Sequence, residues 1–258
     1  MKVQKLSLSI LILWGCCFAV CCKKDKAAPK NPVAVSPPEQ EQLPGVYVPK
    51  KLSTGKANML FGYTKSGALT KVDYENGDST VLKYNAEGKP LEFSCYETGK
   101  LILTTYYSRN ADGWIIKAQT YKVTGKDQVK TGSYTVTYSG SQIAAILYYN
   151  KDNRLLEEQQ YSYTAAGNLT AQKSPLLTAN YSYDLKNGLF KNVGYAWLFA
   201  LEKENSLFLS GVNNIQNCSY PAESVSNQQL SYTYNTDGYP TAITITALGL
   251  SATTKVSY

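Results

Sequence analysis

Short runs of alternating apolar and polar residues fill the chain from about residue 57 to its end. In one such run, Leu230, Tyr232 and Tyr234 alternate with Ser231 and Thr233. Successive side chains of a β-strand point to opposite faces, so this period of two predicts strands with one buried face and one solvated face. Burial on one face only favours antiparallel sheets over parallel ones.

A fixed spacing marks the turns between these runs. A tyrosine is followed four residues later by a glycine and then by a residue that opens the next run: Tyr63, Gly67 and Leu69; Tyr84, Gly88 and Pro90; Tyr163, Gly167 and Leu169; Tyr234, Gly238 and Pro240. Glycine readily adopts the left-handed conformation of such turns, and asparagine also tolerates it, as expected at Asn153. We predict an all-β fold: an antiparallel meander of many hairpins that curls into an open barrel or an extended twisted sheet.

One stretch interrupts the strand pattern. Residues 195–201 are dense in bulky apolar side chains, including Trp197 and Phe199, and Glu202, Lys203 and Glu204 follow them. A run of this kind at a break in the alternation predicts a short helical or irregular plug near residues 190–205. Filling the concave face of the sheet is the preferred interpretation of this plug, and gating of a ligand is the alternative.

Two family resemblances rest on these motifs. The tyrosine–glycine turns, with Tyr183-Asp184 as their one Tyr-Asp pair, resemble the YD-repeat (RHS-like) pattern, which implies a hairpin architecture. A second set resembles the middle of DUF4595-like Bacteroidota lipoproteins of unknown function: Tyr181-Ser182-Tyr183-Asp184, Asn187, Phe190-Lys191-Asn192 and Asn213-Asn214-Ile215. The usual proline after the asparagine is absent. This resemblance covers roughly residues 57–258 and implies a porin-like open β-barrel.

The N-terminus carries the features of an export signal. Lys2 and Lys5 form a short basic region before an apolar run. That run is too short to span a membrane readily, as in a secretory signal peptide. The cysteines that follow resemble a bacterial lipobox, in which one cysteine receives the lipid. Cys22, with Lys-Lys-Asp after it, is the preferred lipidation site and Cys16 is the second candidate. A plain cleaved signal and an uncleaved anchor are the alternatives.

Proline and charge set the next segment apart. Six of the ten prolines lie in residues 23–50, where they favour an extended, open backbone. We assign residues 1–22 to the lipoprotein signal peptide, 23–56 to a proline-rich disordered tether and 57–258 to a single β-meander domain. The chain has a formal net charge of +7, but residues 31–258 hold 20 basic and 18 acidic residues. A nearly neutral domain gives no reason to expect a nucleic-acid partner.

Few residues of the predicted domain suit catalysis. The chain has no histidine, which excludes Ser-His-Asp triads, Cys-His pairs and the usual zinc sites. Glu157 and Glu158 are adjacent, so on a strand they face opposite sides. We therefore expect no catalytic residue, no metal site and no cofactor, and we expect that the protein is not an enzyme. Cys95 and Cys218 are expected to be buried and free, with a disulfide as the alternative.

Tyrosine dominates the aromatic residues, at 22 against 6 phenylalanines. Tyrosine suits surfaces with one apolar and one wet side. Possible ligand-facing aromatics are Tyr106, Tyr148, Tyr161, Tyr163, Tyr181 and Trp197. Such rings can stack on a glycan or on peptide side chains, although cross-strand aromatic pairs also stabilise sheets on their own account.

These features together predict a lipid-anchored protein of the cell envelope, at the outer membrane or the cell surface. Its β domain is expected to be a non-catalytic binding or structural module, with the membrane as its partner through the N-terminal lipid and a glycan or a peptide as its candidate ligand. The first alternative is an integral, porin-like outer-membrane barrel, which the terminal Tyr258 on an alternating strand would suit. The second is a glycan-acting enzyme, which requires two carboxylates about 5–10 Å apart.

Overall fold

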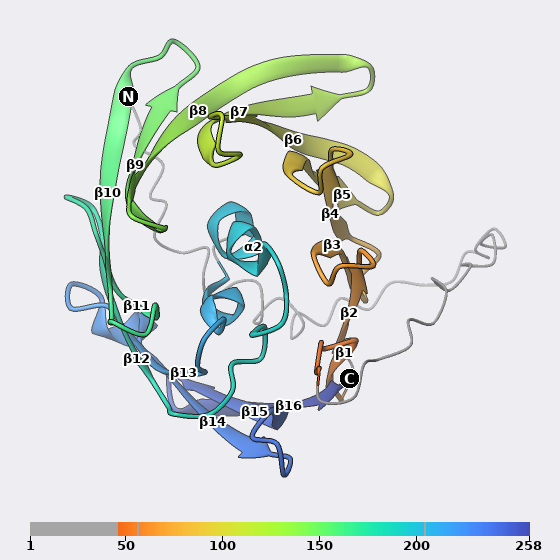
Figure 1. The fold of residues 1–258 in the computed structure, drawn as a ribbon, viewed down its shortest axis with the longest axis vertical. Coiled ribbons are helices and arrows are strands. Elements are labelled where there is room, and N and C mark those ends of the chain that lie inside the picture. Colours follow the sequence, from red (N-terminus) through yellow and green to blue (C-terminus); the bar gives the residue numbers. More distant parts are fainter. Residues whose placement is uncertain (1–45, 56, 204) are drawn as a thin grey trace, which may run out of the picture. The chain divides into compact units, whose positions relative to one another are not determined.

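A computed structural model describes residues 46–258 except 56 and 204. The signal peptide, both candidate lipidation sites (Cys16 and Cys22) and the tether up to residue 45 lie outside the described residues. Residues 44–258 form one compact unit. In the described residues, sixteen antiparallel strands follow one another around a closed barrel, which confirms the predicted all-β meander (Figure 1).

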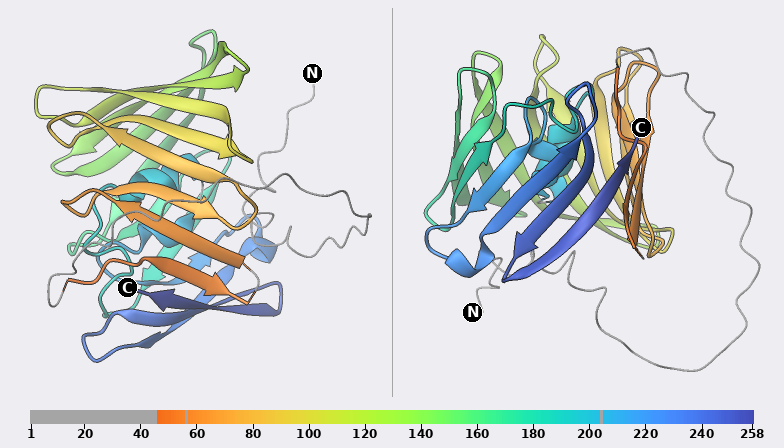
Figure 2. Two further views of the ribbon diagram at one scale, coloured as in Figure 1. Left: turned by 90° about the vertical axis from the view of Figure 1, so that its right-hand side faces the viewer. Right: turned by 90° about the horizontal axis from the view of Figure 1, so that it is seen from below.

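The strands vary in length from four to thirteen residues. The first eight are β1 (Lys51–Thr54), β2 (Ala57–Tyr63), β3 (Leu69–Tyr74), β4 (Ser79–Tyr84), β5 (Pro90–Glu97), β6 (Lys100–Arg109), β7 (Ile115–Thr124) and β8 (Asp127–Ser139). The others are β9 (Gln142–Asn150), β10 (Leu155–Tyr163), β11 (Leu169–Lys173), β12 (Thr178–Tyr183), β13 (Ile215–Ser219), β14 (Gln228–Tyr234), β15 (Pro240–Ala247) and β16 (Leu250–Ser257). They are tilted across the barrel, as closure requires (Figure 2).

Strand β1 closes the barrel. Leu52 lies opposite Met59 of β2 on one side and opposite Val256 of β16 on the other. The expected open barrel is therefore closed, because β1 pairs the backbone groups that an open sheet would leave free at its two edges. Strand β1 falls inside residues 23–56, which the proline content had assigned to the tether, so the domain includes strand residues before 57.

The tyrosine–glycine spacing corresponds to a repeated turn. At β4–β5 the register shifts between Lys83 and Tyr84, and Gly88 adopts a φ of +73°. The Tyr84 hydroxyl donates to the Leu69 carbonyl oxygen at 2.6 Å, which ties the end of β4 to the start of β3. Asn153 takes the glycine position at β9–β10, with a φ of +60°. Tyr84 is thus placed where its ring packs inside the barrel against Tyr195 and its hydroxyl satisfies a carbonyl group.

Inward-facing and outward-facing positions differ sharply in chemistry. Leu82 and Phe93 lie opposite each other on the inner face of β4 and β5 and are buried. Their neighbours Lys83 and Glu92 form an ion pair of 2.9 Å on the outer face. On β15 and β16 the outer face carries hydroxyl pairs, such as Thr244 with Thr253 at 2.8 Å. On these strands the buried apolar side chains point into the barrel, and charged and hydroxyl side chains lie on its outer face.

The predicted plug lies in the barrel interior (Figure 1). It contains helix α2 (Ala196–Lys203) and the 3₁₀ turn η3 (Ser206–Leu209), while a second 3₁₀ turn, η4 (Ser224–Ser226), precedes β14. Phe199 of α2 contacts Phe93 with ring centroids 5.0 Å apart, and Phe208 of η3 stacks on Phe190 at 4.9 Å. All four rings are at most 1% exposed. Burying one such ring stabilises the fold by about 2 kcal/mol. The prediction of a short, partly helical plug that fills the interior of the sheet is confirmed.

A hydrogen-bond network fastens the plug to the barrel. The Asp184 carboxylate accepts hydrogen bonds from the Asn214 backbone N–H at 3.1 Å and from the Tyr234 hydroxyl. The Asn214 side chain accepts from the Leu189 N–H at 2.9 Å and donates to the Asn187 carbonyl at 2.8 Å. The asparagine and aspartate residues that carried the DUF4595-like resemblance therefore hold both ends of the inserted segment.

Cys95 on β5 and Cys218 on β13 are buried and free, as expected, so the described residues contain no disulfide. No helix in the described part of the chain is both long enough and apolar enough to cross a membrane.

Candidate functional site

One side of the barrel interior is lined by hydrogen-bonding side chains. Tyr148 of β9, Gln159 and Tyr161 of β10, Gln172 of β11 and Tyr181 of β12 form what we call the polar wall. Gln159 Oε1 accepts from the Tyr161 hydroxyl at 2.9 Å and from Gln172 Nε2 at 2.8 Å. The Tyr181 hydroxyl lies 3.5 Å from Gln172 Oε1. These bonds connect three strands, and a side-chain hydrogen bond between Tyr148 and Tyr161 adds β9 to the network.

The polar wall faces inward and yet remains partly exposed. Tyr148 lies opposite Tyr134, which reaches the plug, and Tyr161 lies opposite Gln172. All five wall residues have intermediate exposure. Phenylalanines on the other side of the interior are almost completely buried. Inward-facing side chains can keep exposure only where the interior is incompletely filled, so solvent reaches this part of the barrel.

Glu202, near the end of α2, connects the plug to the neighbouring strands. Its carboxylate accepts hydrogen bonds from the Tyr134 hydroxyl at 2.7 Å, the Tyr107 hydroxyl at 3.0 Å and Thr105 Oγ1 at 3.2 Å. Desolvation raises the pKa of Glu202, and the three hydrogen bonds oppose this shift. The result is a carboxyl group that is oriented by three hydroxyls and holds its proton more tightly than a free glutamate.

Burial also raises the pKa values of the tyrosines on this side. Desolvation is the main cause for both Tyr148 and Tyr161. Both phenols therefore stay protonated at physiological pH and keep their capacity to donate hydrogen bonds. With the two glutamine amides, the wall offers donors, acceptors and aromatic rings to a molecule in the interior.

The aromatic residues singled out from the sequence are only partly brought together. Tyr148, Tyr161 and Tyr181 lie on the polar wall. Tyr163 follows Tyr161 on the inner face of β10, where burial raises its pKa to about 12. Trp197 lies on α2 and is half-buried.

Tyr106 lies apart from the others. It is 38% exposed and contacts Tyr121 at a centroid distance of 5.8 Å. Its neighbours Thr105 and Tyr107 both reach Glu202, so strand alternation directs Tyr106 to the outer face.

Sequence reasoning missed the residues that complete the site. Glu202 was noted only as part of a charged end to the plug, and Gln159, Gln172, Tyr107 and Tyr134 were not singled out. Glu202 meets Tyr134 across 68 residues of sequence and Tyr107 across 95. One signal in the sequence could have identified Glu202. It is an acidic residue within the segment that the sequence predicted to fill the interior of the sheet.

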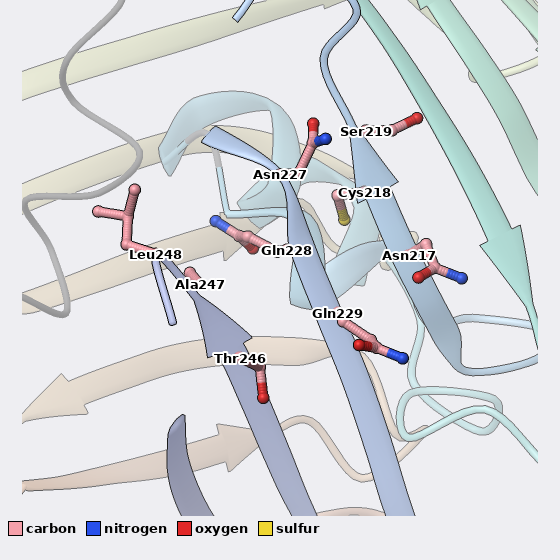
Figure 3. Close-up of a pocket in the computed structure, with 9 residues that line it drawn as sticks. All are labelled: Asn217, Cys218, Ser219, Asn227, Gln228, Gln229, Thr246, Ala247 and Leu248. Carbon is pink, nitrogen blue, oxygen red and sulfur yellow. The ribbon is translucent and has the colours of Figure 1, made fainter. Parts of the chain in front are cut away.

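A second location is a small hollow of about 270 Å³ beside η4 (Figure 3). It is lined by Asn217, Cys218, Ser219, Asn227, Gln228, Gln229, Thr246, Ala247 and Leu248. Burial raises the pKa of the Cys218 thiol to about 11, which disfavours the nucleophilic thiolate. Because the lining is otherwise composed of amides, the separate hydroxyls of Ser219 and Thr246, and alkyl groups, the hollow offers less chemistry than the polar wall. Within the described residues, no group of three or more Cys, Asp or Glu side chains is placed to hold a metal ion.

Comparisons with solved structures identify the same architecture in porin-like proteins. A porin-like protein from Bacteroides uniformis ATCC 8492 is similar, with a TM-score of 0.52 and 11% identity over 81% of this chain and 96% of its own. A porin-like protein from Bacteroides vulgatus ATCC 8482 has a TM-score of 0.50 and 15% identity over 82% and 99%. At these identities the likeness concerns the fold alone. No protein-family model matches the chain, and no curated protein matches its sequence. The YD-repeat and DUF4595-like resemblances therefore stay predictions.

Proposed function

We propose that this chain is an exported, lipid-anchored protein of the cell envelope whose barrel is a non-catalytic binding module. The observation that supports a binding role is the polar wall, which faces the interior and still keeps partial exposure. Binding sites are concave and combine aromatic surface with a few oriented polar groups. The wall has this composition, and it lies on the inner face of the barrel strands.

The chemistry of the wall favours a small, polar and largely uncharged ligand. The phenol and amide groups of the wall donate and accept hydrogen bonds without a formal charge, and Glu157, which accepts from Gln159 at 3.3 Å, adds one carboxylate that can accept from ligand hydroxyls. A saccharide matches them, because its hydroxyls pair with amides and its ring faces pack on aromatic side chains. A short peptide segment is the alternative ligand that the same groups would serve.

The binding proposal can be tested on residues 44–258 with immobilised glycans and peptides, followed by titration calorimetry on any ligand found. Tyr148→Ala should weaken binding at least tenfold because it removes an inward ring. Tyr149→Ala is the matched control, since Tyr149 occupies the outward position beside it, and it should leave the affinity within about twofold. Equal losses in the two variants, or no ligand in the screen, would contradict a site on the polar wall.

The lipid anchor is supported by the sequence around Cys22 and Cys16, which lie outside the described residues. Metabolic labelling of the full chain with a clickable fatty-acid analogue tests it. Cys22→Ala should abolish labelling and membrane attachment, and Cys16→Ala should leave both unchanged. The reverse pattern would move the lipid to Cys16, and an unlabelled wild-type chain would refute the anchor.

An integral outer-membrane barrel is the first alternative, and the two Bacteroides neighbours are described as porin-like. A membrane-spanning barrel needs an apolar outer band about 25 Å tall. The outer wall here instead carries ion pairs, such as Lys71 with Asp73 at 2.8 Å, and hydroxyl pairs, such as Thr246 with Ser251 at 2.8 Å. We therefore expect residues 44–258 to be monodisperse without detergent; a requirement for detergent would favour the integral barrel.

A glycan-acting enzyme is the second alternative, and one pair of carboxylates favours it. Glu157 lies opposite Tyr148 on the inner face, and Glu202 also interacts electrostatically with Tyr148. A carboxyl with a raised pKa beside a second carboxylate is the arrangement that glycoside hydrolysis uses. Release of reducing sugar from a glycan panel, lost in Glu202→Gln and in Glu157→Gln, would establish catalysis. We expect no release.

A further inference from the structure

Exposed apolar side chains concentrate at one end of the barrel. In an antiparallel meander every second turn lies at the same end, so one rim is formed by the turns of β1–β2, β3–β4, β5–β6, β7–β8, β9–β10, β11–β12, β13–β14 and β15–β16. We call it the hairpin rim. Among the described residues, eight large apolar side chains are more than half exposed. Seven of them lie on the hairpin rim: Val129, Leu155, Leu156, Leu176, Val225, Leu248 and Leu250, at 55–78%. The eighth, Leu185, lies at the other end, in the segment between β12 and β13.

Basic side chains accompany the apolar ones on three neighbouring hairpins. Residues 122–130, 150–156 and 173–177 hold six basic and two acidic residues. The basic residues are Lys122, Lys126, Lys130, Lys151, Arg154 and Lys173. Lys130 Nζ donates to Asn153 Oδ1 at 2.8 Å, which joins the β7–β8 hairpin to the β9–β10 hairpin. Together with Val129, Leu155, Leu156 and Leu176, these residues form a basic and apolar arc.

Most of the other hairpins of the rim are not basic. The β3–β4 turn carries Glu75 and Asp78, the β13–β14 connection carries Glu223, and Glu97 and Lys100 balance each other in the β5–β6 turn. The hairpin rim is therefore electrically asymmetric, although apolar side chains occur on most of its circumference. A negatively charged surface would attract one part of the rim and repel another.

We propose that the basic and apolar arc docks on the surface of an anionic lipid bilayer. The apolar side chains lie on separate hairpins along an arc and do not form one contiguous patch. A protein partner would need a contiguous patch, whereas a fluid lipid surface can accommodate each hairpin tip independently. Lysine and arginine side chains can place their alkyl stems beside lipid chains and their charges beside phosphates. Repulsion at Glu75 and Asp78 tilts the barrel, so part of the rim stays away from the lipid.

This inference is independent of the lipid anchor and of the polar wall, so it is tested on residues 44–258, which contain all sixteen strands and the packed core. The measurement is co-sedimentation with vesicles of phosphatidylcholine and phosphatidylglycerol in equal parts, against phosphatidylcholine alone. Wild type should bind the anionic vesicles and lose binding as salt rises. Each basic side chain near an anionic surface is worth about a fivefold change in partitioning, so Lys126→Gln with Arg154→Gln and Lys173→Gln should weaken binding about one hundredfold.

The apolar contribution has a matched control on the same rim. Leu155→Ser together with Leu156→Ser should lower binding at least tenfold. The pair Leu248→Ser and Leu250→Ser makes the same chemical change on the β15–β16 hairpin, outside the basic arc, and should leave binding within about twofold. Circular dichroism establishes that each variant is folded.

Three results would overturn the proposal: equal binding to the two vesicle types, equal losses in the arc and control variants, or concentration-dependent self-association in light scattering that the arc substitutions abolish. The last result would identify a second copy of the chain as the partner of the arc.

Discussion

The two sides of the barrel interior are filled differently: one by tightly packed aromatic rings and the other by hydrogen-bonded polar side chains. On the packed side, Phe93, Phe199 and Phe208 interlock with centroid distances of 5.0 and 5.4 Å. On the polar wall, Tyr161 and Gln172 are joined by hydrogen bonds through Gln159 and keep partial exposure. A sixteen-stranded barrel is too wide for its own side chains to fill. The plug fills the packed side, and polar side chains on the other side tolerate the water that remains.

Helix α2 separates the two environments. Leu198 and Phe199 are fully buried against the packed side, and Glu202 three residues further on reaches the hydroxyls of Tyr107 and Tyr134. Residues three or four apart lie near one another on a helix. The apolar contact of Phe199 and the polar contacts of Glu202 therefore come from neighbouring positions on the surface of α2. The difference between the two sides therefore depends on one short helix holding its position.

The largest expected effect comes from opening the packed side. Phe199→Ala removes the ring that contacts both Phe93 and Phe208, and it should lower the free energy of unfolding by about 3–5 kcal/mol. Tyr161→Ala on the polar wall should cost less, because water can enter the space it leaves. Urea unfolding of the two variants gives the comparison, and equal losses would mean that the two sides are packed alike.

The next effect comes from releasing the plug. Asp184→Ala leaves the donors of Tyr234, Asn214 and Lys186 without their acceptor, and we expect a loss of about 2–3 kcal/mol. Limited proteolysis should then cut within residues 184–214. Asp152→Ala is the control, because its ion pair with Lys151 is exposed and should contribute less than about 0.5 kcal/mol. A loss of that small size at Asp184 would contradict a fastening role.

A smaller, pH-dependent effect belongs to Glu202. Because its pKa is raised by burial, the folded state binds its proton more tightly than the unfolded state does. The stabilisation is complete below the ordinary glutamate pKa of about 4.3 and is lost as pH rises through the folded-state value. Relative to wild type, Glu202→Gln should therefore gain stability as the pH is raised from about 4 toward 8.

Urea titrations at several pH values measure this difference. Glu158→Gln, on the outward position of β10, serves as the control and should follow the wild-type pH dependence. If Glu202→Gln also followed it, Glu202 would be as well solvated as a surface carboxylate, and the contrast between the two sides of α2 would be smaller than we describe.

The smallest effect is expected from removing a single hydroxyl. Tyr161→Phe should cost no more than about 0.5 kcal/mol, since water can satisfy Gln159 on the exposed wall. Tyr84→Phe should cost about 1 kcal/mol, because the Leu69 carbonyl at 2.6 Å loses its donor in a less exposed place. Thermal or urea unfolding of both variants measures the two losses of stability. A larger loss in Tyr161→Phe than in Tyr84→Phe would mean that the filled side of the interior lies elsewhere.

Much of the architecture follows from local patterns. The alternation in Leu230–Tyr234 became strand β14, the interruption near residue 196 became α2, and the glycine position of the turns is occupied by residues with positive φ, such as Gly88 and Asn153. These features depend on backbone sterics and on the period of the strand, which act over a few residues. Closure was not visible in the same way, because β1 comes from a short run beside the proline-rich segment.

The amino-acid sequence by itself determined that the chain forms antiparallel hairpins, where they turn, and where an apolar insert interrupts them. Only the tertiary structure decided that Lys51–Thr54 closes the ring, that Tyr148 points inward while Tyr106 points outward, and that Glu202 meets Tyr107 and Tyr134. The physical reason is range. Turn and strand preferences are set between residues close in the sequence. The face to which a side chain points depends on the register of bulged strands, and the contacts of Glu202 depend on a helix that is far along the chain from the strands it meets.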